Sequence, residues 1–462
     1  MRIFLIILSF ILLFYKTTSY IVIPFKTFKN SETQASLNLA KDFLNKNLNN
    51  TIYIEIEAGN PTQKIPALIL SEEFGFFILN HKCLISSSFD KIEKTSFFLK
   101  SENFKDNMTF RNDIFKFPTE SSTLKQASLN FMYSKNMNKN SINFDNEQKQ
   151  KYSCAGVGIR GAQYFGKNKE YNLVKQLFNK NVIKNNYFSI IYSSNFNDEG
   201  TFLIGIEPHN HDKKNFCGQQ LTYITNEEKN NFIYWSLLPN KIFFTLNNKI
   251  YNLTNNINCI LDYNLGIIFG SDNYLKIIRE QYFNNLSLEL KCHEEIIHSV
   301  YNVFYCDNIK DVEKFPSLNF YLEQKLYTFT LDYKDLFYEK NGKYFFKIIF
   351  DRNNKNQWKL GKPFLKKYIF VFDYSTKMIG FYNENLPKSN RIKKISYILM
   401  YILVILTISF FCYIGFYHGK KVYNKAINEK EEEYDYKYKS REERTQANSY
   451  IEMMMESKVL DE

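Results

Sequence analysis

Two short loops of the sequence carry side chains suited to acid–base chemistry. Residues 70–73 (Leu-Ser-Glu-Glu) follow an apolar, alternating run over residues 52–70 that is interrupted at Gly59-Asn60-Pro61. Residues 262–264 (Asp-Tyr-Asn) follow the apolar run 259–261. A carboxylate placed at the end of a buried strand can serve as a general acid or base. Either loop is therefore a candidate for chemistry.

Other catalytic and metal-binding patterns are weak. His293 and His298 are five residues apart, which on a helix separates the two imidazoles by about 140°, so they would not converge on a metal. His209 and His211 follow Glu-Pro and are expected in a turn. The sequence has no G-x-S-x-G motif, no P-loop and no C-x-x-C motif. We therefore expect no metal site and no cofactor.

The elements that must position these loops are predicted to be mostly β-strands. The chain has 34 Tyr and 44 Phe residues, a composition that favours strands. The interruption at residues 59–61 predicts a turn between two strands of a hairpin. Residues 172–183 form the clearest amphipathic helical pattern, with apolar residues recurring every three to four positions. We predict a mainly β protein with a few short helices.

The two ends of the chain predict a membrane-anchored protein. Residues 1–19 have a basic start and a short apolar run, which is typical of a secretory signal peptide, with an uncleaved anchor as the alternative. Residues 395–417 form an uncharged run of 23 residues, long enough to cross a bilayer. Lysines flank this run on both sides, so the signal peptide decides the orientation. We expect a single-pass type I protein with a cytosolic tail, residues 418–462.

The charge of the chain does not indicate nucleic-acid binding. The net charge is +12, and the tail contributes nine Lys/Arg against eleven Asp/Glu. The excess of positive charge therefore lies in the extracytosolic part, where the lysines are scattered. Binding of nucleic acid usually requires clustered basic residues. We expect none.

Cysteines and glycosylation sequons fit the secretory compartment. Of seven cysteines, Cys412 lies in the predicted span and the other six are extracytosolic, so disulfides are expected. Six cysteines allow fifteen pairings. Cys292–Cys306 is the preferred pair because it closes a short loop. Candidate glycosylation sites are the four sequon asparagines, Asn49, Asn107, Asn252 and Asn285.

An ordered series of segments resembles the pepsin-like aspartic peptidase family. The series covers roughly residues 21–386, and "WKLGKPFLKKYIFVFDYSTKMIGFY", residues 358–382, is its most specific member. The resemblance implies a two-lobed, pepsin-like fold with one C-terminal transmembrane helix. The expected regions are a signal peptide (1–19), a prosegment-like region (20–50), an N-terminal lobe (51–225), a C-terminal lobe (226–388), the span (395–417) and the tail (418–462).

The resemblance also places the candidate active site. Each lobe of the family brings an Asp-Thr-Gly loop to the floor of a cleft, and the two carboxylates share one proton during peptide hydrolysis. An ungapped comparison puts Leu70-Ser71-Glu72 at the first loop and Asp262-Tyr263-Asn264 at the second. Asp262 is thus the one retained catalytic position, unless it only forms a hydrogen-bonded turn. Asn264, at the glycine position, is expected to tolerate a left-handed backbone.

A second departure concerns the flap that closes the family's cleft. That flap carries Tyr-Gly, whereas residues 97–153 contain only Tyr133 and Tyr152, neither followed by glycine. By contrast, the scaffold glycines Gly156, Gly158 and Gly361 are present. The sequence therefore predicts a retained fold with a degenerate site.

Two functions remain open. The first is a membrane-anchored, pepsin-fold protein of the secretory or endosomal pathway, or of the cell surface, that binds a peptide or protein in its interlobe cleft with impaired catalysis. The second is an active aspartic endopeptidase with a non-standard site, in which Glu72 or Glu73 would partner Asp262.

Overall fold

The structure is a computed structural model. It describes residues 19–27, 38–48, 50–78, 90–91, 97–100, 105–118, 124–134, 155–162, 171–193, 198–226, 228–229, 232–283, 292–353, 358–383 and 390–459. Residues 1–18 of the predicted signal peptide and the sequons at Asn49 and Asn285 lie outside these residues. The chain divides into two compact units, residues 1–386 and 387–462.

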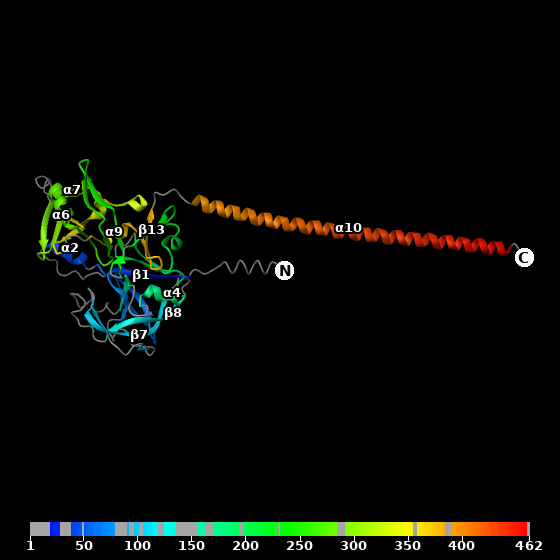
Figure 1. Cartoon of the computed structure of the whole chain (residues 1–462), viewed down its shortest axis with the longest axis horizontal. Helices are drawn as coiled ribbons and strands as arrows, with labels where there is room; N and C mark the ends of the chain where they lie inside the picture. The colour runs from blue at the N-terminus through cyan, green and yellow to red at the C-terminus, as the bar shows by residue number, and fades with distance from the viewer. Residues whose placement is uncertain are drawn as a thin grey trace. The chain divides into compact units, whose positions relative to one another are not determined.

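The first unit is built mainly of β-sheet, as predicted. Its largest sheet has fourteen strands, and Figure 1 shows β1 lying between a half that carries β7 and β8 and a half that carries α6 and α7. In spatial order, the strands of this sheet are β13 (Gln220–Thr225), β30 (Met378–Asn383), β29 (Phe370–Asp373), β11 (Tyr187–Tyr192), β12 (Glu199–Ile204), β1 (Ile21–Thr27), β2 (Ile52–Ala58), β3 (Gln63–Leu70), β9 (Ala155–Ile159), β4 (Phe74–Ile78), β8 (Leu124–Ser134), β7 (Lys105–Pro118) and β5 (Asp90–Lys91), with β6 (Phe97–Lys100) paired to β7.

Three further sheets complete the unit. The nine-stranded sheet comprises β16 (Ser236–Leu237), β19 (Cys259–Leu261), β28 (Trp358–Leu360), β20 (Ile268–Gly270), β27 (Ile348–Asp351), β22 (Tyr301–Cys306), β26 (Lys343–Phe346) and β25 (Phe337–Lys340), with β21 (Cys292–Ile297) paired to β22. The four-stranded sheet comprises β18 (Lys249–Asn255), β17 (Lys241–Leu246), β23 (Leu318–Leu322) and β24 (Tyr327–Leu331), and the small sheet β10 (Gly161–Ala162), β15 (Phe232–Ile233) and β14 (Glu228–Lys229).

The helices of the first unit are short. They are α2 (Leu39–Leu48), α4 (Leu173–Asn179), α5 (Pro208–His211), α6 (Asp272–Ile278), α7 (Ile309–Val312), α8 (Tyr333–Leu336) and α9 (Lys362–Lys367), with a π-helical turn at Arg279–Phe283 and a 3-10 turn at Glu323–Lys325. The predicted helix 172–183 is confirmed as α4, whose first turn is capped by the Asn172 side chain. It ends before the predicted limit because Asn181 has a φ of 56°, which is incompatible with a continuing helix.

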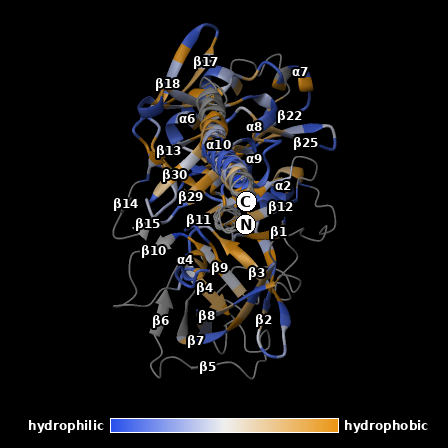
Figure 2. Ribbon diagram, turned by 90° about the vertical axis from the view of Figure 1, so that its right-hand side faces the viewer, coloured by the Kyte–Doolittle hydropathy of each residue, from blue (hydrophilic) through white to orange (hydrophobic). Residues whose placement is uncertain are grey.

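The predicted hairpin forms as β2 and β3. The two strands pair antiparallel from Tyr53↔Leu68 to Ala58↔Gln63, and Gly59 at the turn has a φ of 85°, a conformation that favours glycine. Inward positions alternate along β2, whereas the last four residues of β3 are all buried. The reason is that β3 lies between two strands and is covered on both faces. Figure 2 shows the apolar character of β3.

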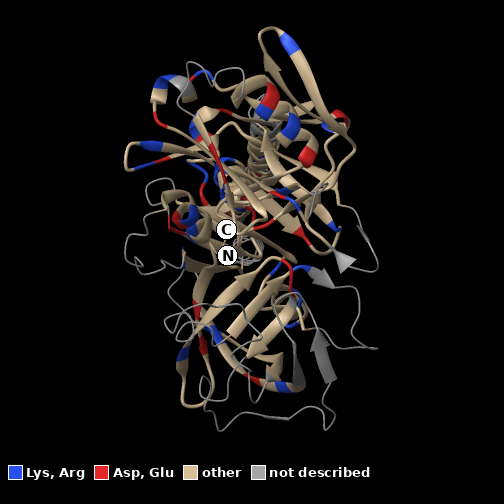
Figure 3. Cartoon of the chain, turned by 90° about the vertical axis from the view of Figure 1, so that its left-hand side faces the viewer, with Lys and Arg blue, Asp and Glu red and all other residues tan. Residues whose placement is uncertain are grey.

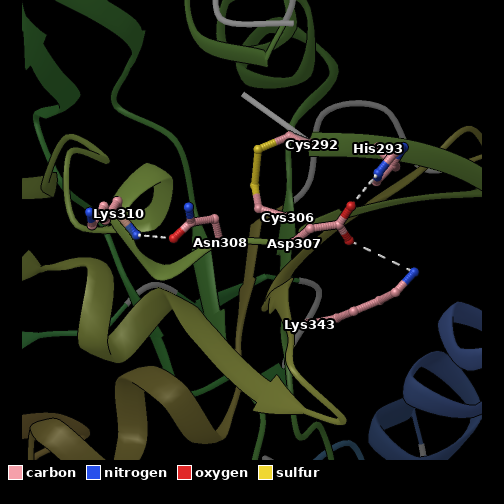
Figure 4. Close-up of a disulfide and its surroundings, with 7 residues drawn as sticks. All are labelled: Cys292, His293, Cys306, Asp307, Asn308, Lys310 and Lys343. Carbon is pink, nitrogen blue, oxygen red and sulfur yellow. Dashed lines mark hydrogen bonds and ion pairs between the residues drawn. A yellow bond between two sulfur atoms is a disulfide. The ribbon is translucent and has the colours of Figure 1, made fainter. Parts of the chain in front are cut away.

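The predicted disulfide Cys292–Cys306 is confirmed. The two cysteines face each other across the β21–β22 ladder, and Figure 4 shows Asp307 beside the bridge with His293 and Lys343 turned towards it. The distances are 3.0 Å from His293 Nε2 to Asp307 Oδ2 and 3.8 Å from Lys343 Nζ to Asp307 Oδ1.

Two of the six cysteines outside the predicted span are free thiols. Cys217 is an exposed thiol and Cys259 a buried one. Cys259 lies inside β19, where a small apolar side chain suffices for packing. Cys83 and Cys154 lie outside the described residues.

The second unit is a single helix, α10 (Asn390–Val459). Its 70 residues correspond to about 105 Å of helix. The part from Met400 to Met455 qualifies by length and composition as a membrane-spanning candidate, and its apolar portion includes most of the predicted span 395–417. The remainder of α10 is polar and carries (i, i+4) ion pairs such as Lys425–Glu429.

Candidate functional site

The first candidate loop begins where β3 ends. Leu70 pairs with Gly158 in the parallel β3–β9 ladder, and its side chain is 8% exposed. A Cβ atom added at Gly156 would lie 2.8 Å from Leu70 Cδ1, so the leucine fills the space that this glycine leaves open. Leu70 is thus a packed apolar residue at the end of β3, where the ungapped sequence comparison expects the family's first aspartate.

The second candidate loop follows β19. Asp262 N–H donates to the Leu360 carbonyl at 3.0 Å, and Asp262 Oδ1 accepts from the Asn264 N–H at 2.9 Å. The Asp262 residue is only 4% exposed. The Gly361 that follows β28 packs against this loop, because a Cβ there would lie 2.1 Å from the Ile267 carbonyl oxygen. Asp262 therefore makes the turn hydrogen bond considered as its alternative role.

The Tyr263 side chain packs in the hydrophobic core and does not line the candidate site. Its side chain is 1% exposed and stacks on Tyr192 with ring centroids 6.3 Å apart, while Phe372 meets it edge-on at 6.0 Å. Burial raises the pKa of Tyr263 well above its usual value. The hydroxyl role of the family's threonine in this loop is therefore not filled by Tyr263.

The two loops face each other, as expected, and are joined by three hydrogen bonds. Ser71 Oγ accepts from the Tyr263 N–H at 2.8 Å. Asn264 Oδ1 accepts from the Ser71 N–H at 2.9 Å, and Asn264 Nδ2 donates to the Ile69 carbonyl at 2.7 Å. Asn264 is not among the residues with positive φ, so the expectation of a left-handed backbone there is wrong. Its amide side chain instead binds the opposite loop.

A compact group of charges surrounds Asp262. Glu72, which the sequence comparison aligns with the family's glycine, forms an ion pair with Lys359 at 2.5 Å. The pKa of Asp262 is raised to about 6, first by burial and then by the negative charge of Glu72, while Lys359 and hydrogen bonds from Asn264 and Ser71 oppose the rise. Asp262 is therefore a carboxyl group that gains its proton in mildly acidic solution.

A second cation, Arg160, supports the Glu72 loop. Its Nη1 donates to the Glu72 carbonyl at 3.2 Å, and its backbone N–H donates to the Glu73 carbonyl at 2.9 Å. The guanidinium carbon lies 3.3 Å from the centre of the Tyr234 ring, a cation–π contact. Burial lowers the pKa of Arg160, and Tyr234, Glu73 and Glu72 counteract this.

Sequence reasoning missed both cations. The available signal was a charged residue inside an otherwise apolar segment, since Lys359 lies between Trp358 and Leu360, and Arg160 follows Ile159. Leu70 itself is the last residue of the β3–β9 ladder, whereas Glu72 and Glu73 follow the strand.

The remaining sequence candidates do not converge on a site. His293 bonds Asp307, whereas His298 Nε2 contacts Asn45 Oδ1 at 3.4 Å. Among the described residues, no three His, Cys, Asp or Glu side chains are grouped to hold a metal ion. Tyr133 is buried in the core, with Arg111 at 5.4 Å from its ring, and Tyr152 lies outside the described residues.

Comparisons with known proteins agree with this geometry. The model of the family described as "Eukaryotic aspartyl protease" matches residues 116–383, which is more than half of the chain. The chain belongs to the eukaryotic aspartyl protease family. The match includes the Asp262 loop and leaves out the Leu70 loop. No curated protein matches the chain.

Two solved structures share the fold. Conglutin gamma, a basic 7S globulin from lupine seeds, has a TM-score of 0.58 at 12% identity, covering 79% of this chain and 95% of its own. Basic 7S globulin from soybean has a TM-score of 0.56 at 10% identity, covering 80% of this chain and 98% of its own. At such identities the likeness concerns the fold alone, and the aspartyl protease fold is common to proteins named for a different role.

Proposed function

We propose that this aspartyl protease family member is a membrane-anchored protein that binds a peptide or protein segment between its lobes, with impaired peptidase chemistry. The observation that carries the proposal is that Leu70, which the sequence comparison aligns with the first catalytic carboxylate, is a buried aliphatic side chain. Peptide hydrolysis in this family needs one carboxylate to activate water and another to protonate the carbonyl oxygen. Leucine can do neither.

The hydrogen bonds around Leu70 support a site that keeps its shape without a carboxylate at position 70. The loops still meet through Ser71 and Asn264, so the junction between the lobes keeps its shape while one carboxylate is missing. General acid–base help is worth roughly 10² to 10⁴ in rate per group. Without one of the two groups, hydrolysis of a bound segment would be slower by about this factor. The segment would then dissociate before it is cleaved, which suits binding more than turnover.

The test uses the full-length protein purified in detergent. It is incubated with a denatured protein between pH 3 and pH 6, with and without a pepstatin-type inhibitor, and with Asp262→Asn as the matched variant. We expect segments to be retained by both proteins without new cleavage products. Cleavage with an acid optimum that pepstatin blocks and Asp262→Asn abolishes would overturn the proposal.

A second candidate function is an acid endopeptidase in which Glu72 partners Asp262. The observation in its favour is that the charge of Glu72 raises the pKa of Asp262, so the two carboxylates act on each other. Against it, Glu72 is held by Lys359. In this case Glu72→Gln would abolish acid cleavage as completely as Asp262→Asn, whereas Glu55→Gln, at an exposed position of β2, would leave it unchanged.

The proposed setting is the secretory or endosomal pathway or the cell surface, with residues 418–462 in the cytosol. The apolar portion of α10 and the Cys292–Cys306 disulfide support this setting. Asn252 is exposed on β18, as a glycosylation site must be, and Asn107 lies in β7.

A further inference from the structure

The N-terminal region 20–50, which resembles a prosegment, is built into the centre of the largest sheet. β1 lies between β12 and β2. It pairs with β12 through six residues, from Ile21↔Ile204 to Lys26↔Glu199, and with β2 from Phe25↔Ile54 to Thr27↔Ile52. Both edges of β1 are therefore occupied.

The side chains of β1 belong to the main hydrophobic core. Ile21, Ile23 and Phe25 are each at most 1% exposed. The Phe25 ring meets Tyr192 edge-on at 5.4 Å and lies over Gly200, where an added Cβ would approach Phe25 Cζ to 2.4 Å. Gly200 of the neighbouring strand β12 thus leaves the space that the Phe25 ring occupies.

The second element of the region, α2, packs on the other lobe. Phe43 stacks on Phe345 with ring centroids 4.9 Å apart, and Ala40 and Leu44 are buried beside it. These α2 residues form one hydrophobic cluster with Ile267, Ile297, Val303, Phe345 and Ile349. The region 20–50 therefore contributes to the cores of both lobes.

The end of α2 is also bonded to the loop that carries Asp262. The Gly266 N–H donates to the Asn47 carbonyl at 2.8 Å, and the Asn50 N–H donates to the Asn264 carbonyl at 2.9 Å. A Cβ at Gly266 would lie 2.6 Å from Asn47 Oδ1, so the two segments are in direct contact. The region 20–50 thus positions the same loop that binds Ser71 from the other side.

We infer that residues 20–50 are a permanent brace of the mature ectodomain and are not released as a prosegment. Only 24 residues separate Thr27 from Ile52, and ten of them form α2, which is committed to the C-terminal lobe. Among the described residues of this interval, none is available to replace β1. Removal of β1 would expose the edges of β12 and β2 that now pair with it, and their backbone N–H and C=O groups would be left without partners. The inference does not depend on whether the Asp262 site is active.

The first test determines the N-terminus of the full-length protein isolated from membranes. Tryptic peptides are quantified by mass spectrometry after the membranes are held at pH 4 or pH 7. We expect the peptide that contains Ile21–Phe25 and ends at Lys26, whatever its first residue, in the same molar amount as Leu326–Lys334 of the C-terminal lobe under both conditions. A folded protein that lacks any peptide containing Ile21–Phe25, or that loses it in acid, would overturn the inference.

The second test asks whether the region contributes to the stability of the mature protein. Phe43→Ala should lower the thermal unfolding midpoint of the purified full-length protein, whereas Lys41→Ala, at an exposed position of the same helix, should leave it unchanged. If Phe43→Ala prevents accumulation, Phe43→Leu gives a smaller shift in the same direction. Since a released segment cannot affect stability, an unchanged midpoint in the Phe43 variants would contradict the brace.

Discussion

At the scale of single residues, the site is defined by one apolar residue, Leu70, and four polar residues around Asp262. Leu70 contributes packing only, whereas Ser71 and Asn264 carry the hydrogen bonds between the loops. Glu72 and Lys359 then add a charge pair close to Asp262. The hydrogen bonds that join the loops and the charges near Asp262 are therefore carried by different residues, and each can be tested separately.

Leu70→Asp should not restore peptidase activity. The substitution removes the packing of the Leu70 side chain over Gly156 and places a carboxylate in an apolar environment. We therefore expect the free energy of unfolding to fall by about 2 to 5 kcal/mol. Glu72 would still occupy the glycine position. The measurements are urea denaturation and cleavage of denatured protein at pH 3 to 6. Leu70→Met, which keeps the volume, should cost less than about 1.5 kcal/mol, and pepstatin-sensitive cleavage by Leu70→Asp would show this view to be mistaken.

The raised pKa of Asp262 predicts a specific dependence of stability on pH. Because the folded protein holds this proton more tightly than the unfolded chain, the contribution is fully present below pH 4 and is lost as the pH rises through about 6. The loss should reach about 3 kcal/mol at most. The measurement is the unfolding free energy of the native protein minus that of Asp262→Asn, at pH 4 and pH 7. A difference that does not change between these values would refute the shifted pKa.

Ser71→Ala should weaken the junction between the loops. The substitution removes the acceptor of the Tyr263 N–H, and a buried donor without a partner costs about 1 to 3 kcal/mol. Ser71→Thr keeps the hydroxyl and serves as the control, with an effect of less than about 1 kcal/mol expected. Thermal unfolding measures both. Equal midpoints for the alanine and threonine variants would mean that this hydrogen bond contributes nothing.

At the scale of elements, local patterns were predictable and long-range polar contacts were not. The β2–β3 hairpin, α4 and the Cys292–Cys306 pair follow from apolar alternation, an amphipathic repeat and a short loop, each contained in a few consecutive residues. The Asn264 bonds and the Glu72–Lys359 pair join residues about two hundred or more positions apart. No local pattern encodes such a contact, so Asn264 was expected to shape its own turn.

The β21–β22 hairpin gives the prediction that belongs to this scale. Replacing both Cys292 and Cys306 by Ser should lower the free energy of unfolding by about 2 to 3 kcal/mol, because the bridge closes a loop of 14 residues. Cys217→Ser, at an exposed free thiol, should change it by less than about 0.5 kcal/mol. Urea titrations of the three proteins provide the comparison. A larger effect from Cys217 would indicate that this thiol has a partner.

At the scale of the whole molecule, the chain combines a charged, β-rich unit, residues 1–386, with one long helix. Figure 3 shows Lys and Arg scattered among the acidic residues of the lobes rather than gathered in one stripe. This distribution fits the prediction that the positive net charge is solvated surface. The proposed function then depends on the junction between the lobes and on which side of a membrane that junction lies.

The orientation is the prediction on which the proposed function depends. If residues 1–19 direct secretion and the apolar part of α10 spans the membrane, the ectodomain lies in the lumen and residues 418–462 lie in the cytosol. Protease added to sealed vesicles should then remove only the tail, a loss of about 5 kDa by its length, and glycosidase treatment should shift the protected fragment because Asn252 is exposed. Permeabilised vesicles, in which the ectodomain is also accessible, are the control.

Digestion of the ectodomain in sealed vesicles, with the tail protected and the sequons unmodified, would reverse the orientation. It would also place the Asp262 loop in the cytosol, where neither the pH near 6 that protonates this carboxyl nor the oxidising conditions that maintain Cys292–Cys306 prevail.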